Sequence, residues 1–125
     1  MTKPTGLWNI LVVEDDPKRI EWFRAQYKTA HELVFTSDPD EAIRLLQREE
    51  DDWDVLFLDH DLGKEPKAGR DVTLWLCAQP RKVQSDLYTL VHSVNVVSGP
   101  KIEREMAAAG RPCRWLPFYV LANHV

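Results

Sequence analysis

An uninterrupted apolar run near the middle of the sequence ends in three ionisable side chains. The segment reads DVLFLDHDLG, and Asp59, His60 and Asp61 follow its apolar residues directly. Carboxylates bind divalent cations, and imidazole gives or takes a proton near pH 7. Side by side, these residue types indicate a site for metal-dependent or acid–base chemistry.

A second group of acids follows another apolar run, NILVV, and begins with Glu14 and Asp15. Carboxylates that lie close together need protons or a divalent cation to relieve their repulsion. We expect Glu14, Asp15 and Asp59 to bind Mg²⁺ or Mn²⁺, whose preferred ligands are oxygen atoms. The alternative is that the acids only cap the helices that follow them, which suits Asp16 well and Asp59 poorly.

A second candidate histidine, His92, lies in the segment VHSVN together with Ser93 and Asn95. Two histidines near an acidic cluster could give and take protons as a general acid and a general base near pH 7. Ser93 and Asn95 have an alternative role, which is to cap the next helix.

Strands and helices alternate along the chain. Short apolar runs predict strands at 9–14, 32–37, 54–59, 87–93 and 113–121, and helical patterns lie at 15–30, 38–49, 70–79 and 99–110. This order predicts an α/β fold, a doubly wound parallel sheet with helices on both faces. The carboxyl ends of such strands share one edge, where ligands bind, so we expect the candidate residues to gather there.

Length and composition restrict the classes of function. The 125 residues, with a formal charge of −4 spread over interspersed acids and bases, predict a single domain over 1–125 that does not bind extended nucleic acid. No apolar run approaches the roughly 18 residues of a membrane span. We therefore expect a cytoplasmic protein without a membrane partner.

The segments ILVVEDDPKR and DVLFLD, and a later strand that ends in a hydroxyl residue, resemble the receiver domain of two-component response regulators. The resemblance spans nearly the whole chain and implies a flavodoxin-like, five-stranded sheet of order 2-1-3-4-5. It implies that Glu14 and Asp15 are the metal-binding pair and that Asp59 is the phosphoacceptor. Ser93, or else His92, would stand at the position of the switch hydroxyl.

Two departures from the receiver pattern affect function. Receivers have a lysine at the end of the fifth strand, whereas no lysine follows Lys101 here. The residues after the fifth predicted strand are few, so a fifth helix is expected to be absent or truncated. The sheet face that this helix would cover is then a candidate surface for a homodimer or a protein partner.

The segments HDLG, HSVN and PKRIEWF resemble a divergent family, the cyclic-phosphate processing receiver domains. This resemblance implies metal-dependent hydrolysis of a cyclic phosphate or cyclic nucleotide. His92 would activate water and His60 would protonate the leaving oxygen, or the reverse. Ser93 and Asn95 would donate hydrogen bonds to phosphoryl oxygens, and Asp61 would orient an imidazole or join the metal ligands.

Two other functions fit the same residues. One is a receiver-like module that binds a protein partner and does no chemistry. The other is a single-domain receiver that is phosphorylated on Asp59, although the missing lysine counts against it.

Overall fold

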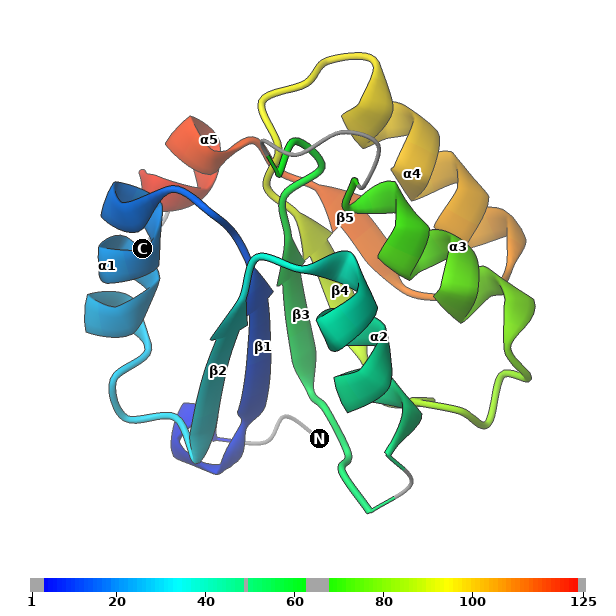
Figure 1. Cartoon of the computed structure of the whole chain (residues 1–125), viewed down its shortest axis with the longest axis horizontal. Coiled ribbons are helices and arrows are strands. Elements are labelled where there is room, and N and C mark those ends of the chain that lie inside the picture. Colours follow the sequence, from blue (N-terminus) through cyan, green and yellow to red (C-terminus); the bar gives the residue numbers. More distant parts are fainter. Residues whose placement is uncertain (1–3, 49, 63–67, 124–125) are drawn as a thin grey trace.

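The computed structural model describes residues 4–48, 50–62 and 68–123 (Figure 1). Within these ranges a short 3-10 helix at Thr5–Leu7 precedes alternating strands and helices. The strands are β1 (Asn9–Val13), β2 (Glu32–Thr36), β3 (Val55–Leu58), β4 (Tyr88–Val91) and β5 (Cys113–Trp115). The α-helices are α1 (Pro17–Gln26), α2 (Pro39–Gln47), α3 (Arg70–Ala78), α4 (Ser98–Ala108) and α5 (Phe118–Ala122). None of the helices in these ranges is long and apolar enough to cross a membrane.

All neighbouring strands are parallel, and their order is β2-β1-β3-β4-β5. Helices α1 and α5 lie on one face of the sheet, and α2, α3 and α4 lie on the other (Figure 1). The predicted doubly wound, flavodoxin-like sheet of order 2-1-3-4-5 is therefore confirmed.

Strand β1 shows how the sheet separates two cores. Successive side chains of a strand point to opposite faces. Ile10 and Val12 accordingly pack in the core under α1 and α5, whereas Leu11 and Val13 pack in the core under α2, α3 and α4. All four are fully buried, as expected of a strand that is covered on both faces.

The start of helix α1 follows from two adjacent residues. The Asp16 side chain accepts a hydrogen bond from the Lys18 amide at 2.8 Å, and Pro17 occupies the first helical position. Proline suits that position because it has no amide hydrogen, and an amide hydrogen there would have no partner within the helix. Asp16 therefore has the capping role expected of it.

The prediction of a strand over 113–121 is wrong in its second half, because β5 ends at Trp115 and a helix begins at Phe118. Pro117 stands at the helix start, and its carbonyl oxygen accepts hydrogen bonds from the amides of Val120 and Leu121. Strand β5 does lie at the sheet edge, as a nearby proline indicates. The fifth helix is truncated to five residues and not absent, and it buries Leu121 against the sheet.

Candidate functional site

The register of the sheet places three ionisable residues in a row at the carboxyl ends of its central strands. The last residues of β1, β3 and β4 are paired with one another. The residue that follows each of them is ionisable: Glu14, Asp59 and His92. The Asp59 amide donates to the carbonyl oxygen of Val13 at 3.0 Å. The His92 amide donates to that of Leu58, also at 3.0 Å, so the ladder of hydrogen bonds continues through the row.

These three side chains, which we call the buried trio, point to the face covered by α1 and α5. One ligand atom from each lies within 4.8 Å of the others. Their residues are only 1% (Glu14), 4% (Asp59) and 0% (His92) exposed. Among the described His, Cys, Asp and Glu residues, these alone form such a group. The His92 ring also packs against Phe23 of α1 and Phe118 of α5, with centroids 5.1 and 6.2 Å apart.

Glu14 and His92 form a buried hydrogen bond, with 2.7 Å between Glu14 Oε1 and His92 Nε2. Burial lowers the pKa of His92 despite the opposing effect of Glu14. Burial raises the pKa of Glu14, but the hydrogen bond and charge of His92 and a main-chain amide at Asp16 more than offset it and leave that pKa below its ordinary value. The Glu14 carboxylate therefore accepts a hydrogen bond from the Nε2–H of His92.

Asp59 is the member of the trio whose charge is least well compensated. Burial, and then the negative charge of Glu14, raise the pKa of Asp59 to about 7, against an opposing effect of Arg19. Its carboxyl group is thus poised between protonated and ionised forms at neutral pH. A cation beside it would favour the carboxylate.

Arg19 of α1, which sequence analysis did not single out, supplies a positive charge to this site. Its Nη1 atom lies 3.8 Å from Glu14 Oε1 and 3.8 Å from Asp59 Oδ2. The guanidinium also lies over the Phe118 ring, 5.1 Å from its centroid. Its spacing could have identified it from the sequence. Arg19 precedes the fully buried Phe23 by four residues, so the two side chains lie on the same face of the helix.

Three other predicted residues lie at the same sheet edge but outside the trio. Asp15 and Asp61 are exposed. Partial burial and the Glu14 charge raise the pKa of Asp15. His60 follows Asp59 and therefore starts toward the opposite face. Its side chain is 18% exposed, and its Nε2 lies 4.0 Å from Asp61 Oδ1.

Ser93 and Asn95 shape the connection between β4 and α4. Asn95 Oδ1 accepts hydrogen bonds from the amides of Val97 and Ser98, at 3.0 and 2.9 Å, in the turn that leads into α4. Ser93 Oγ accepts from the Asn95 amide at 3.1 Å. The Trp115 indole donates to the Ser93 carbonyl oxygen at 2.8 Å, so this connection is tied to β5 as well.

Comparison with protein families gives a match that covers most of the chain. The model of the cyclic-phosphate processing receiver domain matches residues 10–108. The chain belongs to this family. No curated protein matches the chain.

Solved structures similar to this cyclic-phosphate processing receiver domain share its fold. The N-terminal domain of an uncharacterized Wolinella succinogenes protein has a TM-score of 0.64 and 21% identity, with 94% of this chain and 86% of that one covered. The N-terminal domain of a response regulator receiver protein from Methanoculleus marisnigri has a TM-score of 0.60 and 19% identity, covering 95% of this chain and 96% of that one. The receiver domain of a Pseudomonas aeruginosa sensor histidine kinase, solved with a magnesium ion in its active site cleft, has a TM-score of 0.59 and 24% identity, covering 89% and 84%.

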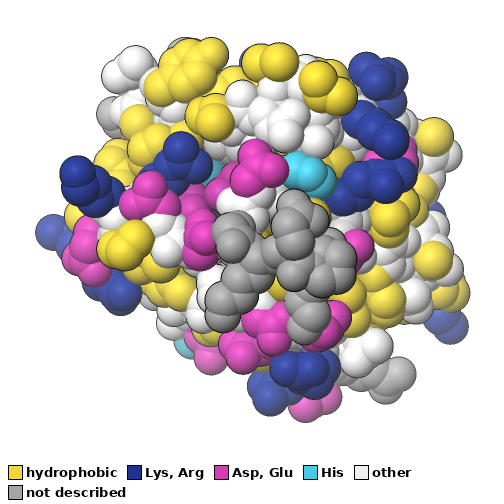
Figure 2. Space-filling view, turned by 45° about the horizontal axis from the view of Figure 1, so that its top comes forward, with side chains coloured by type: hydrophobic (Ala, Val, Ile, Leu, Met, Phe, Trp, Pro, Cys, Tyr) yellow, Lys and Arg dark blue, Asp and Glu magenta, His cyan; other side chains and the backbone are white. Residues whose placement is uncertain are grey.

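One face of this cyclic-phosphate processing receiver domain carries charged side chains of both signs (Figure 2). Figure 2 shows acidic side chains gathered beside a histidine, with basic side chains nearby. A hollow of about 200 Å³ opens at the carboxyl ends of β1 and β2 and is lined by Glu14, Asp15, Phe35 and Ser37, among others. A small ligand could therefore approach Glu14 from this side.

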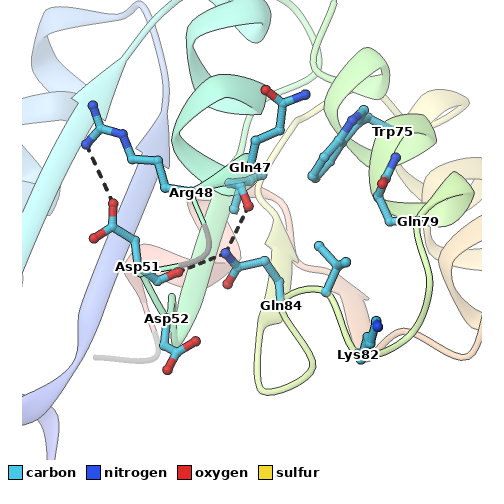
Figure 3. Close-up of a pocket in the computed structure, with 10 residues that line it drawn as sticks. Gln47, Arg48, Asp51, Asp52, Trp75, Gln79, Lys82 and Gln84 are labelled. Carbon is cyan, nitrogen blue, oxygen red and sulfur yellow. Dashed lines mark hydrogen bonds and ion pairs between the residues drawn. The ribbon is translucent and has the colours of Figure 1, made fainter.

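A larger hollow of about 400 Å³ lies between the ends of α2 and α3 and the loops that follow them (Figure 3). Gln84 lines this hollow and connects its sides. The Gln84 side-chain amide donates hydrogen bonds to the carbonyl oxygens of Leu46 and Asp51 and accepts one from the main-chain amide of Trp53. Gln84 has a left-handed backbone, with φ of 51°. None of the predicted site residues lines this hollow.

Proposed function

We propose that this receiver domain hydrolyses a cyclic phosphate linkage with a divalent cation bound at the buried trio. The observation that supports the proposal most is the pairing of two buried carboxylates, Glu14 and Asp59, at the carboxyl edge of a parallel sheet. Ligands bind at this edge in such folds. The family description, cyclic-phosphate processing, supplies the class of substrate.

The donor atoms of the trio fit a hard divalent cation. The pKa of Asp59, raised to about 7 by burial and by Glu14, reflects a repulsion that a cation would relieve. Because His92 Nε2 already binds Glu14, the ligands would be oxygens of Glu14 and Asp59, with Asp15 adjacent, which suits Mg²⁺ or Mn²⁺. The related Pseudomonas domain holds magnesium in its active site cleft. When bound, the cation would polarise a phosphoryl oxygen and lower the pKa of a bound water.

The two histidines receive different roles in this proposal. His92 is fully buried and its Nε2 is hydrogen-bonded to Glu14, so we assign it as a positioning residue that orients this carboxylate, and not as the base that activates water. His60 is more accessible and remains the proposed donor of a proton to the leaving oxygen. Ser93 and Asn95 shape the neighbouring loop, and the hydroxyl and amide hydrogens of these residues are the proposed donors to phosphoryl oxygens.

The test is hydrolysis of 2′,3′-cyclic nucleotides, 3′,5′-cyclic nucleotides and cyclic dinucleotides in the presence of Mg²⁺ or Mn²⁺. We expect Asp59→Asn to lower turnover by about 100-fold or more, because it removes a metal ligand, and His60→Gln also to lower it by about 100-fold or more, because it removes the proposed general acid. The exposed Asp86 serves as a matched control, and Asp86→Asn should retain full turnover. A folded wild-type protein that turns over no member of the panel would contradict the proposal.

A second candidate function, binding of a protein partner or a second copy without chemistry, is favoured by exposed valines. Val94, Val96 and Val97, beside the trio on the connection from β4 to α4, are 46%, 70% and 73% exposed. Self-association seen by light scattering and lost in Val96→Asp would favour this function. Covalent labelling of Asp59 by acetyl phosphate would instead indicate a phosphoacceptor receiver.

A further inference from the structure

Arg19 is held beside the trio by weak, replaceable contacts. Its distances of 3.8 Å to Glu14 and to Asp59 exceed the 2.7–3.2 Å of a hydrogen bond, so these contacts are ion pairs only. The described chain contains a contrasting pair, Arg70 and Glu105, in which Nε donates to Oε1 at 2.9 Å. The Arg19 Nε also lies 4.0 Å from Asp16 Oδ2, and the guanidinium lies over the Phe118 ring, 5.1 Å from its centroid.

The Arg19 side chain is also partly open to solvent. It is 24% exposed, whereas the carboxylates that it faces are buried at 0% and 6% exposure. Its flexible stem lets the guanidinium turn while the helix stays in place. A divalent cation that bound the same two carboxylates would repel the guanidinium at this short distance.

We propose that Arg19 is a displaceable counter-cation, which neutralises Glu14 and Asp59 in the absence of metal and turns toward the phosphoryl group of the substrate once a divalent cation binds them. The guanidinium fork matches phosphoryl oxygens, and Phe118 supports it from one side. The displacement step depends on the metal site alone. The phosphoryl step rests on the proposed function.

The displacement step is tested by titrating the intact protein with Mn²⁺ at pH 8 and measuring the heat of binding. We expect Arg19→Gln to bind Mn²⁺ about tenfold more tightly than wild type, because a competing positive charge is gone. Arg19→Lys, which keeps the charge, should bind nearly as wild type does. Arg24 is a matched control on the same helix, since its guanidinium also lies over a ring, Phe35, at 4.9 Å, and Arg24→Gln should not change the affinity. Unchanged or weaker Mn²⁺ binding by a folded Arg19→Gln would overturn the proposal.

The phosphoryl step is tested by binding of inorganic phosphate to the protein saturated with Mg²⁺, without turnover. We expect Arg19→Gln to weaken phosphate binding by about tenfold or more and Arg19→Lys to weaken it less. Equal phosphate affinity in wild type and Arg19→Gln would overturn this step. Because neither measurement requires catalysis, failure of the hydrolase proposal is distinguished from failure of this one.

Discussion

At the scale of single residues, the main feature of the site is that two buried carboxylates, Glu14 and Asp59, have few nearby groups to offset their negative charges. Glu14 has His92 as a hydrogen-bond partner at 2.7 Å, whereas Asp59 faces the negative charge of Glu14, which the Arg19 guanidinium at 3.8 Å and the main-chain amide of Asp61 only partly offset. The pKa of Glu14 is consequently lowered, and burial together with the Glu14 charge raises that of Asp59 to about 7. The ionised form of Asp59 is thus disfavoured at the place where we propose that a cation binds.

We predict that the buried Asp59 carboxyl group lowers the free energy of unfolding of the metal-free protein as the pH rises. The pKa of Asp59 is raised by burial from 3.8 to about 7, so between these values the folded state retains a proton that the unfolded state has released. The free energy of unfolding therefore falls with rising pH in this window and is unaffected by this group above it. At pH 8, Asp59→Asn should be more stable than wild type by on the order of 1–4 kcal/mol in EDTA.

Urea unfolding of both proteins at pH 5 and pH 8 checks this prediction. Burial lowers the pKa of His92, which acts in the opposite direction over part of the range, so the difference between variant and wild type is the quantity to compare. Equal pH dependence in the two proteins would contradict the explanation. Added Mg²⁺ should stabilise wild type and leave Asp59→Asn unchanged.

At the scale of elements, the connection from β3 to α3 is positioned by a close backbone contact. Gly69 packs directly on the end of β3, and its amide donates to the His60 carbonyl oxygen at 2.9 Å. A Cβ atom at position 69 would lie 2.1 Å from the Asp59 carbonyl oxygen, a main-chain atom that cannot turn aside. The position of Asp59 therefore depends on glycine ten residues later in the chain.

We predict that Gly69→Ala destabilises the protein by about 2 kcal/mol or more and weakens its thermal response to Mg²⁺. Gly6→Ala is the control, because its Cβ would meet only the Thr29 carbonyl oxygen at an ordinary 3.5 Å. Thermal unfolding with and without Mg²⁺ measures both effects. A variant at position 69 that is as stable and responsive as the one at position 6 would show that this contact is unimportant.

The sequence predicts these elements well because their signals are local. Apolar runs locate the strands, and Asp16 with Pro17 marks the start of α1. The segment LPFYVL was misread, since a short apolar run does not distinguish a strand from one turn of helix. The burial of His92 and the approach of Arg19 were not predictable in the same way, because both depend on how α1 and α5 pack over the sheet.

At the scale of the whole molecule, the short helix α5 acts as part of the cover over the trio. It follows the edge strand β5, returns to the face occupied by α1, and buries Leu121 in the same core as Phe23 and Phe57. Phe118, at its first position, contacts Trp22, Phe23 and His92 through ring packing. Helix α5 therefore contacts both the core, through Leu121, and the buried trio, through Phe118.

We predict that Leu121→Ala costs about 2–5 kcal/mol of stability, since it removes buried methyl groups beside the sheet. Tyr119 of the same helix is exposed, and Tyr119→Ala should change stability by less than about 0.5 kcal/mol. Urea unfolding distinguishes the two. Similar small effects would indicate that α5 does not contribute to the core.

The trio continues the hydrogen-bond ladder of the central strands, and this has a consequence for how the site can vary. The Asp59 and His92 amides are bonded within the sheet, so their hydrogens should exchange with solvent only when the whole fold opens. The adaptable parts, Arg19 and the exposed valines, lie instead on α1 and on the connection from β4 to α4. Substitution of these covering residues could therefore change which ligand fits the site. The buried trio would keep its position, because it is part of the sheet.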